Sequence, residues 1–477
     1  MQSLYAIFLS IIFILNSYSA YAAITTHSTL SEWKNETFIK FKESPDSRNV
    51  NSDSIGFTAN ILEDLINQYQ TWFQTTDAKN FLGSYAQKLV VPVNNEIVLI
   101  GDLQGSYHSL MRNLLRLQAL GYVDNNWKIK ANTYLIFLGD LVQGGKHDGE
   151  VLYTVLRLKL ANNNNVICIK GNMDGRQSFH FSKKPELGNF FATFAHALFM
   201  TSGDSTILCS HAGFNLNENF KNFIDGVNRY EKIINQKSPQ QDNANSFESC
   251  GFTGKTAGTN YMLTQKQAIN YFTANGIKAL FRGHQDSSFG LKVFFNQNIH
   301  KDDPKAKELI DKEANSGVKE ATRYHGGTQM YHWSTVINFY NQMGNALADK
   351  NGIILEKCEY PVFTLSSAPE GRTIDFDCFC IVKTAHEYKN WRLVPYEFQL
   401  PSTRNNKFVS IQESGNPTET ISNQNTGIDD IDLDPISVQW TANELSNKLK
   451  SLKDSLEKLK HKLTQLKDRL NDLKNSL

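Results

Sequence analysis

Five short apolar stretches, each ending in a polar turn, constrain the fold of this chain more than any other feature. The first, Glu96–Ile100, is followed by the sequence GDLQG at 101–105. Apolar residues on both faces are typical of a buried parallel strand, and glycine allows the backbone to turn sharply where a strand ends. We therefore expect the polar turns to meet at one edge of a sheet, where α/β proteins bind ligands. The other four stretches are Thr133–Leu138, Val166–Ile169, Ile207–Cys209 and Ala279–Phe281.

The five turns carry oxygen and imidazole groups that can bind a metal ion. Carboxylate, amide and imidazole ligands in this mixture suit a pair of hard-to-borderline divalent cations. A single Gly-Asp after a strand is usually only a turn, and a single histidine among apolar residues is usually a core residue. Such turns in succession favour a metal centre over coincidence. The candidate ligands are Asp102, Gln104, Asp140, Asn172, His211 and His284.

Amphipathic segments alternate with these strands. They predict helices over 106–120, 150–160 and 190–200, because their apolar residues recur at helical spacing. The alternation implies βαβ units and a largely parallel sheet. Further strands without long helices between them suggest a second sheet, and they are expected at 361–365, 373–383 and 391–400.

The polar turns, taken in order, resemble the motifs of the calcineurin-like metallophosphoesterases. SSAP at 366–369 is similar to the phosphoprotein phosphatase branch of that family. The resemblance covers about residues 95–400 and implies an α/β fold of two mixed β-sheets sandwiched between helices in four layers. The whole arrangement is loosely similar to the Wip-type effector phosphatases of Legionella. The motifs are GDLQG at 101–105, GDLVQGG at 139–145, KGNMD at 170–174, SHAG at 210–213 and RGHQ at 282–285.

The resemblance implies a centre with two divalent metal ions, manganese first and iron, zinc or magnesium as alternatives. Two such ions lower the pKa of a bound water and hold the phosphate oxygens for in-line attack. Asp102 and Gln104 would hold the first metal, and Asp140 would bridge both. The second metal would be completed by Asn172, His211 and His284. The implied catalytic residues are Asp102, Asp140, Asn172, Asp174, Arg176 and Arg282, and Lys170 is a further candidate cation near the phosphate.

Three positions depart from the family pattern. Gln104 replaces a histidine, and an amide oxygen ligates a hard cation more weakly than an imidazole does. The sequence QGG at 143–145 replaces Asp-Arg-Gly, so the arginine that clamps the phosphate is missing unless Arg176 or Arg323 takes its place. Met173 replaces the histidine that would protonate the leaving oxygen.

Methionine at position 173 predicts a preference for substrates with good leaving groups. General-acid assistance contributes about 10²–10⁴-fold where it is needed, and an alkoxide such as that of serine needs it most. A phenol has a pKa of about 10 and a nucleotide phosphate a lower one. The protein should therefore prefer phosphotyrosine or a phosphoanhydride, unless His108, His147 or His180 supplies the proton.

Residues 1–22 have the pattern of a secretory signal peptide, with an apolar core at Leu4–Leu15 and a small-x-small cleavage site at 20–22. An uncleaved apolar anchor is the alternative. The expected location is secreted or periplasmic. Such a location permits disulfides, but the spacing of the six cysteines does not reveal their pairing. Residues 23–90 are predicted to be an N-terminal helical extension that packs on the main domain.

The catalytic domain is predicted at 91–401, with insertions near 215–274 and 301–349. Polar residues and then an acidic run predict a linker at 402–438, and a coiled-coil helix is predicted at 439–477.

Leucines separated alternately by four and three residues define the heptads of that helix over 445–477. Lysine occupies most of the flanking heptad positions, so pairing with a second copy gains no salt bridges. We expect an acidic or coiled-coil partner for this segment. It could be another protein, an anionic membrane surface or the chain's own Asp429–Asp434.

Three functions remain open. The formal charge of +1, with 20% charged residues, gives no argument for nucleic acid as a partner. The favoured function is that of a secreted two-metal phosphoprotein phosphatase, which would suit a bacterial effector acting on host phosphoproteins. The second is a dinucleoside tetraphosphatase-type nucleotide hydrolase, which fits GDLQG well and SSAP less well. The third is a catalytically dead interaction protein, which the retained ligand positions argue against.

Overall fold

The computed structural model describes parts of the chain between Thr29 and Gln399. The chain divides into two units, Met1–Gly427 and Ile428–Leu477, and every described residue lies in the first. The predicted signal peptide, linker and coiled-coil helix lie outside the described residues, as do Arg176, His180 and Arg323. The described residues are 29–33, 59–73, 86–143, 147–174, 190–191, 193–214, 216, 218–226, 251–253, 262–285, 290–294, 304, 330–358, 360–367 and 376–399.

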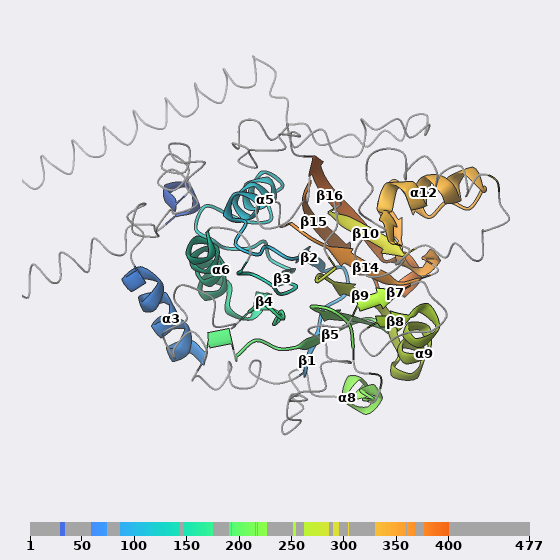
Figure 1. The fold of residues 1–477 in the computed structure, drawn as a ribbon, viewed down its shortest axis with the longest axis horizontal. Helices are drawn as coiled ribbons and strands as arrows, with labels where there is room; N and C mark the ends of the chain where they lie inside the picture. Colours follow the sequence, from blue (N-terminus) through green and yellow to red (C-terminus); the bar gives the residue numbers. More distant parts are fainter. Residues whose placement is uncertain are drawn as a thin grey trace, which may run out of the picture. The chain divides into compact units, whose positions relative to one another are not determined.

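Two seven-stranded mixed sheets form the centre of the described structure (Figure 1). A separate pair of short strands is formed by β7 (Gly251–Thr253) and β8 (Met262–Thr264). In spatial order, the first sheet contains β1 (Ala86–Val90), β5 (Ala197–Ser202), β6 (Ser205–Ser210), β9 (Ile277–Arg282), β14 (Val362–Leu365), β10 (Leu291–Phe294) and β11 (Met330–His332). The second contains β12 (Ala348–Asp349), β13 (Gly352–Ile354), β16 (Arg392–Gln399), β15 (Phe376–Lys383), β2 (Glu96–Ile100), β3 (Thr133–Phe137) and β4 (Val166–Cys168).

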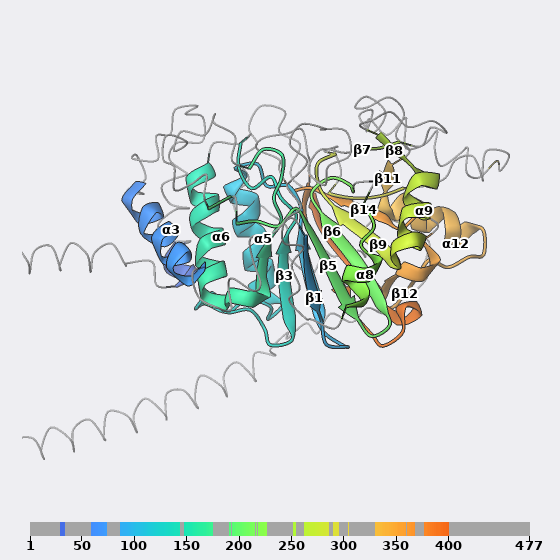
Figure 2. The ribbon, with the colours of Figure 1, turned by 90° about the horizontal axis from the view of Figure 1, so that it is seen from below.

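Helices cover the outer faces of both sheets, which gives the layered arrangement seen in Figure 2. On the second sheet, α5 (Tyr107–Ala119) packs against β15 and α6 (Asp148–Asn162) packs against β4. On the first sheet, α9 (Gln265–Asn275) packs against β9 and α12 (Trp333–Gln342) packs against β10 and β11. A shorter helix, α8 (Lys221–Asp225), contacts α9. The expected fold of two mixed sheets between helices is confirmed.

The five sequence stretches that end in polar turns are strands β2, β3, β4, β6 and β9. Three of them, β2, β3 and β4, are parallel neighbours in the second sheet, and β6 and β9 are parallel neighbours in the first. Side chains from both sheets fill the space between them. On β5, for example, Leu198 and Met200 belong to this central core, whereas Ala197 and Phe199 join the cluster that packs against α8 and α9. Both faces of the strand are buried, which is why these stretches are apolar throughout.

The helix expected at 190–200 is wrong over most of its length. Only Phe190 and Phe191 are helical among the described residues, and Ala197–Ser202 form β5. A turn at Gly203, where φ is +58°, returns the chain so that β5 and β6 pair antiparallel. A short apolar run buried on both faces has the same composition in a strand and in a buried helix, so its periodicity does not separate the two.

The late strands exist as expected, but they do not form one sheet. β15 pairs antiparallel with β2 and extends the second sheet, and β16 pairs with β15. β14 lies in the first sheet, parallel to β9. Residues of the two predicted insertions also take part in the fold, because β11 completes one edge of the first sheet and α9 covers that sheet.

The described parts of the N-terminal extension are the segment 29–33 and α3 (Ala59–Phe73). Trp33 is almost completely buried, its ring centroid lies 4.2 Å from that of Tyr153, and its indole N–H donates to Thr154 Oγ1 at 2.9 Å. α3 packs against α6. Among the described residues no helix is long and apolar enough to span a membrane. The five described cysteines are free, and Cys168 and Cys209 are buried in the core.

Candidate metal centre

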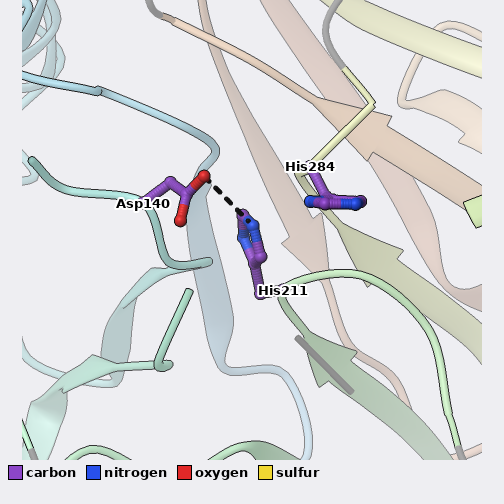
Figure 3. Close-up of side chains that lie close together, drawn as sticks. All are labelled: Asp140, His211 and His284. Atoms are coloured by element: carbon purple, nitrogen blue, oxygen red, sulfur yellow. Dashed lines mark ion pairs between the residues drawn. The ribbon is translucent and has the colours of Figure 1, made fainter. Parts of the chain in front are cut away.

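The candidate ligands follow the ends of strands in both sheets, and the structure brings several of them together. Asp140 follows β3, His211 follows β6 and His284 follows β9. Each offers one atom within 4.8 Å of an atom of the other two. Figure 3 shows His211 next to both Asp140 and His284, and its Nε2 lies 3.3 Å from Asp140 Oδ2. The two sheets therefore contribute ligands to one site, and the expectation that the polar turns meet at the edge of a single sheet is wrong.

Asn172, which follows β4, completes this group. Its Oδ1 atom lies 3.0 Å from His211 Nε2 and 3.1 Å from His284 Nδ1. The Nδ1 atom of His211 is 2.9 Å from the carbonyl oxygen of Leu138. Donation of the Nδ1 proton to that carbonyl leaves the Nε2 lone pair directed at Asp140 and Asn172, as in metal-bound histidines. One carboxylate, one amide oxygen and two imidazoles are a donor set that fits a borderline divalent cation.

Asp102 and Gln104, the expected ligands of the first metal, are placed differently. The Asp102 carboxylate is buried, and both of its oxygens lie 3.0 Å from the backbone N–H of His284. Its Oδ1 atom lies 3.7 Å from His211 Nδ1. Gln104 is buried beside Asp140, to whose carbonyl oxygen its backbone N–H donates at 2.7 Å. Both residues thus adjoin the four-residue group without belonging to it.

Three of the candidate ligands have left-handed backbone conformations, which non-glycine residues adopt rarely. The φ angles are +45° at Gln104, +50° at Asp140 and +69° at His284. Such strain persists only where the surroundings determine the conformation, and it is frequent at functional sites. The turns that follow β2, β3 and β9 are therefore shaped for the position of their side chains.

Asp174 holds the Asp140 turn in this conformation. Its carboxylate accepts the backbone N–H groups of Asp140 and Leu141 at 3.0 Å and of Gly171 at 2.9 Å. In return, Asp140 Oδ1 accepts the N–H of Met173 at 2.8 Å. With Met173 beside it in place of a histidine, Asp174 is held by these backbone N–H groups.

Two positions in the motifs require glycine because neighbouring turns approach each other closely there. A Cβ atom on Gly171 would lie 2.2 Å from Asp140 Oδ1, and one on Gly283 would lie 1.9 Å from Asp102 Oδ1. Real Cβ atoms do not come this close to an oxygen. The glycines of KGNMD and RGHQ therefore make room for the two carboxylates.

Burial and neighbouring charge act on the titratable groups of the centre. Burial by itself would lower the pKa of His211, but the Asp140 and Asp102 carboxylates outweigh it and raise that pKa to about 10. The pKa of Asp174 is raised to about 7, first by burial and then by the Asp140 charge. The group is thus rich in negative charge, which a cation would compensate.

We expect Mn²⁺ affinity to rise with pH by up to about tenfold per unit between roughly pH 6 and 9, because metal binding must displace the proton on His211. In the metal-free protein the same raised pKa stabilises the fold fully below about pH 6.5, and this contribution fades as the pH rises through about 10. Calorimetric titration with Mn²⁺ in buffers of different ionisation enthalpy measures the affinity and the protons released. An affinity that does not change with pH would contradict the raised pKa.

The predicted cations are less directly placed. Arg282 is fully buried, and its Nη1 atom donates to Gln285 Oε1 at 2.6 Å and to Thr364 Oγ1 at 3.2 Å. The contact with Thr364 joins β9 to β14, and a contact of Arg282 with phosphate stays a prediction. The backbone N–H of Lys170 donates to Ala195 at 2.8 Å. Both arginine candidates to replace the missing phosphate clamp, at 176 and 323, lie outside the described residues.

The alternative proton donors His108 and His147 are buried against each other, with ring centroids 5.1 Å apart. The backbone N–H of His147 donates to the carbonyl oxygen of Gly105, in the GDLQG turn, at 3.3 Å.

The groups that fix the position of the candidate ligands were not predicted from the sequence. The Leu138 carbonyl carries no sequence signal, because it is a backbone atom. Ser367 did carry a sequence signal, because it belongs to the SSAP motif. Its backbone N–H donates to the carbonyl oxygen of Asp102 at 2.8 Å.

Residues 96–287 match the family model of the calcineurin-like phosphoesterases. Among solved structures, a protein serine/threonine phosphatase from Saccharomyces cerevisiae with similarity to human phosphatase PP5 has 13% identity and a TM-score of 0.43, and the match covers 71% of this chain and 89% of that one. A putative diadenosine tetraphosphatase has 19% identity and a TM-score of 0.21, with coverages of 28% and 58%. A cold-active protein-tyrosine phosphatase of a Shewanella species has 10% identity and a TM-score of 0.26, with coverages of 64% and 82%.

Proposed function

We propose that the calcineurin-like phosphoesterase domain at residues 96–287 makes the protein a secreted, two-metal phosphoprotein phosphatase that prefers phosphotyrosine. The observation that carries the proposal is the convergence of Asp140, Asn172, His211 and His284 from strands of both sheets. Such a centre suits the hydrolysis of phosphate esters, because water is a weak nucleophile and the phosphoryl group repels anions, and bound metal ions would offset both.

The four converging residues would hold one metal ion, and Asp102 and Gln104 would hold a second, with Asp140 between them. The pair supplies a bound water of lowered pKa and a clamp for the phosphate oxygens. The protein's own residues prepare this chemistry. Leu138 fixes the orientation of the His211 ring, and Asp174 fixes the backbone of Asp140. Manganese is proposed first among the metals that the family resemblance implies, and the carboxylate, amide and imidazole donors are compatible with it.

Met173 supports the proposed preference for phosphotyrosine. Its backbone N–H binds Asp140 Oδ1, so the residue stands directly beside the centre. A thioether carries no proton to donate to a leaving oxygen. A phenolate of pKa about 10 departs with little assistance, whereas a serine alkoxide needs a proton.

Export and partner binding complete the proposal, although they rest on residues outside the described structure. The segment 1–22 would direct the chain out of the cytoplasm, and the leucine heptads of 445–477 would bind an acidic partner, as expected of an effector that acts on host phosphoproteins. A nucleotide phosphohydrolase is the second candidate, because Gln104 and Met173 also suit a phosphoanhydride substrate.

Hydrolysis of p-nitrophenyl phosphate, a phosphotyrosine peptide and a phosphoserine peptide with added Mn²⁺ tests the proposal, beside the Asp102→Asn variant. We expect activity that requires metal, disappears in the variant and favours the aryl esters by about 10²–10⁴-fold. Equal rates on the two peptides would contradict the leaving-group argument. Release of ADP from a dinucleoside tetraphosphate, without phosphopeptide hydrolysis, would favour the second candidate. No hydrolysis and no bound metal would indicate an interaction protein.

A further inference from the structure

We propose that Ser367 is a positioning residue for the metal centre, because its side chain fixes the backbone segment that holds Asp102. Ser367 lies just after β14 in the first sheet, and Asp102 lies just after β2 in the second. The inference rests on the proposed function, in which Asp102 is a metal ligand.

The two sheets meet through their backbones at this point. Asp102 and Ser366 form a parallel β-bridge, and the N–H of Ser367 donates to the carbonyl oxygen of Asp102 at 2.8 Å. The approach is so close that a Cβ atom on Gly101 would lie 2.1 Å from the carbonyl oxygen of Leu365. No side chain separates the two backbone segments here, so a displacement of the Ser366–Ser367 backbone would also displace Asp102.

The hydroxyl group of Ser367 ties this backbone to two further elements. It accepts the N–H of Cys378, in β15, at 2.8 Å and donates to the carbonyl oxygen of the same residue. The side-chain amide of Asn113, in α5, donates to it at 3.3 Å. Ser367 is completely buried, so water does not compete for these bonds. A single hydroxyl therefore joins the end of β14 to the neighbouring strand and helix.

The elements to which Ser367 is tied are themselves firmly connected. The buried carboxylate of Asp377, next to Cys378 in β15, accepts a hydrogen bond from Ser109 at 2.6 Å and forms ion pairs with Arg112 at 2.5 Å and Arg116 at 2.8 Å. All three partners lie on α5. This helix begins directly after the GDLQG turn, so the same network holds both ends of the Asp102 segment.

Two roles for the Ser367 hydroxyl make different predictions. If it only stabilises the core, its removal lowers the melting temperature and leaves metal binding unchanged. If it positions Asp102, its removal weakens metal binding, as loss of an outer hydrogen-bond partner weakens metal affinity by about 10–100-fold in other metal sites. Metal affinity measured directly, rather than activity alone, therefore separates the two roles.

The matched control is Ser202. Its hydroxyl is also buried, but it has no hydrogen-bond partner in the described structure. Ser202 ends β5 at the turn into β6, and the strand β6 runs from that turn to His211. Replacement of Ser202 by alanine thus removes a buried hydroxyl at the opposite end of the strands from the metal centre.

The experiment compares Ser367→Ala, Ser367→Cys and Ser202→Ala with the wild-type full chain in reducing buffer, by calorimetric titration with Mn²⁺ and by thermal melting. We expect Ser367→Ala to raise the Mn²⁺ dissociation constant by about 10–100-fold, Ser367→Cys to raise it less, and Ser202→Ala to leave it unchanged. Ser367→Cys fills the site with a thiol, which is a weaker hydrogen-bonding group, and it tests the proposal if the alanine variant does not fold.

Wild-type affinity in both Ser367 variants, or in the cysteine variant if it alone folds, would overturn the positioning role and leave the proposed function intact. An equal loss of affinity in Ser202→Ala would overturn it as well, because the effect would then follow from any buried hydroxyl. A wild-type protein that binds no Mn²⁺ would overturn the proposed function together with this inference.

Discussion

Replacement of Asp140 by asparagine is expected to lower metal-dependent hydrolysis by about 10³-fold, because the metal ions supply several kcal/mol of transition-state stabilisation. Asparagine keeps an oxygen that can accept the N–H of Met173, so the turn retains its hydrogen bond. What is lost is the negative charge that would lie between the two proposed metal positions. The measurement is kcat for p-nitrophenyl phosphate together with the metal content of the purified variant.

Asp225→Asn is the matched control for this prediction. The Asp225 side chain is 53% exposed on α8 and pairs with Lys221. An exposed pair of this kind contributes little to stability, so metal content and kcat should both stay at the wild-type level. A wild-type rate and full metal content in Asp140→Asn would show that the bridging position is assigned to the wrong residue.

The substitution Met173→His is expected to raise the rate on a phosphoserine peptide by about 10²-fold, towards the lower end of what a general acid contributes. Asp174, the nearest carboxylate in sequence, is already engaged by three backbone N–H groups and is not free to orient the new imidazole. For that reason we expect a partial gain. The rate on a phosphotyrosine peptide should change by less than about tenfold, because a phenolate needs little protonation.

A series of aryl and alkyl phosphates measures this effect as the dependence of kcat on the pKa of the leaving group. The wild-type protein should show a steep dependence, and Met173→His a shallower one. The control is Met343→His, which should show the same dependence as the wild type. Met343 is exposed and lies directly after α12, the helix on the outer face of the first sheet. A slope that is equally shallow in the wild type would indicate that another group, such as His108 or His147, already donates the proton.

The places of the candidate ligands near strand ends were predictable from the sequence, because each lies in a turn shortly after a buried strand. A strand end and its turn are local features, and the glycines at 101, 139, 171 and 283 mark them in the sequence. The contacts that fix the position of these ligands were harder to predict from the sequence. The Leu138 carbonyl, the backbone partners of Asp174 and the inter-sheet bonds of Ser367 join residues that are far apart in the chain or involve backbone atoms, which no residue type announces.

The sequence alone was enough to predict the five buried strands that end in polar turns, the helices that follow β2 and β3, and the polar side chains that these turns present. These properties depend on neighbouring residues, through burial on two faces and the conformational freedom of glycine. The tertiary structure was needed to show that 197–202 is a strand, that β14 lies in a different sheet from β15 and β16, and that Asn172 reaches His211 and His284. Strand pairing is a contact between distant segments, and a two-residue alternation specifies which faces are buried but not which neighbour buries them.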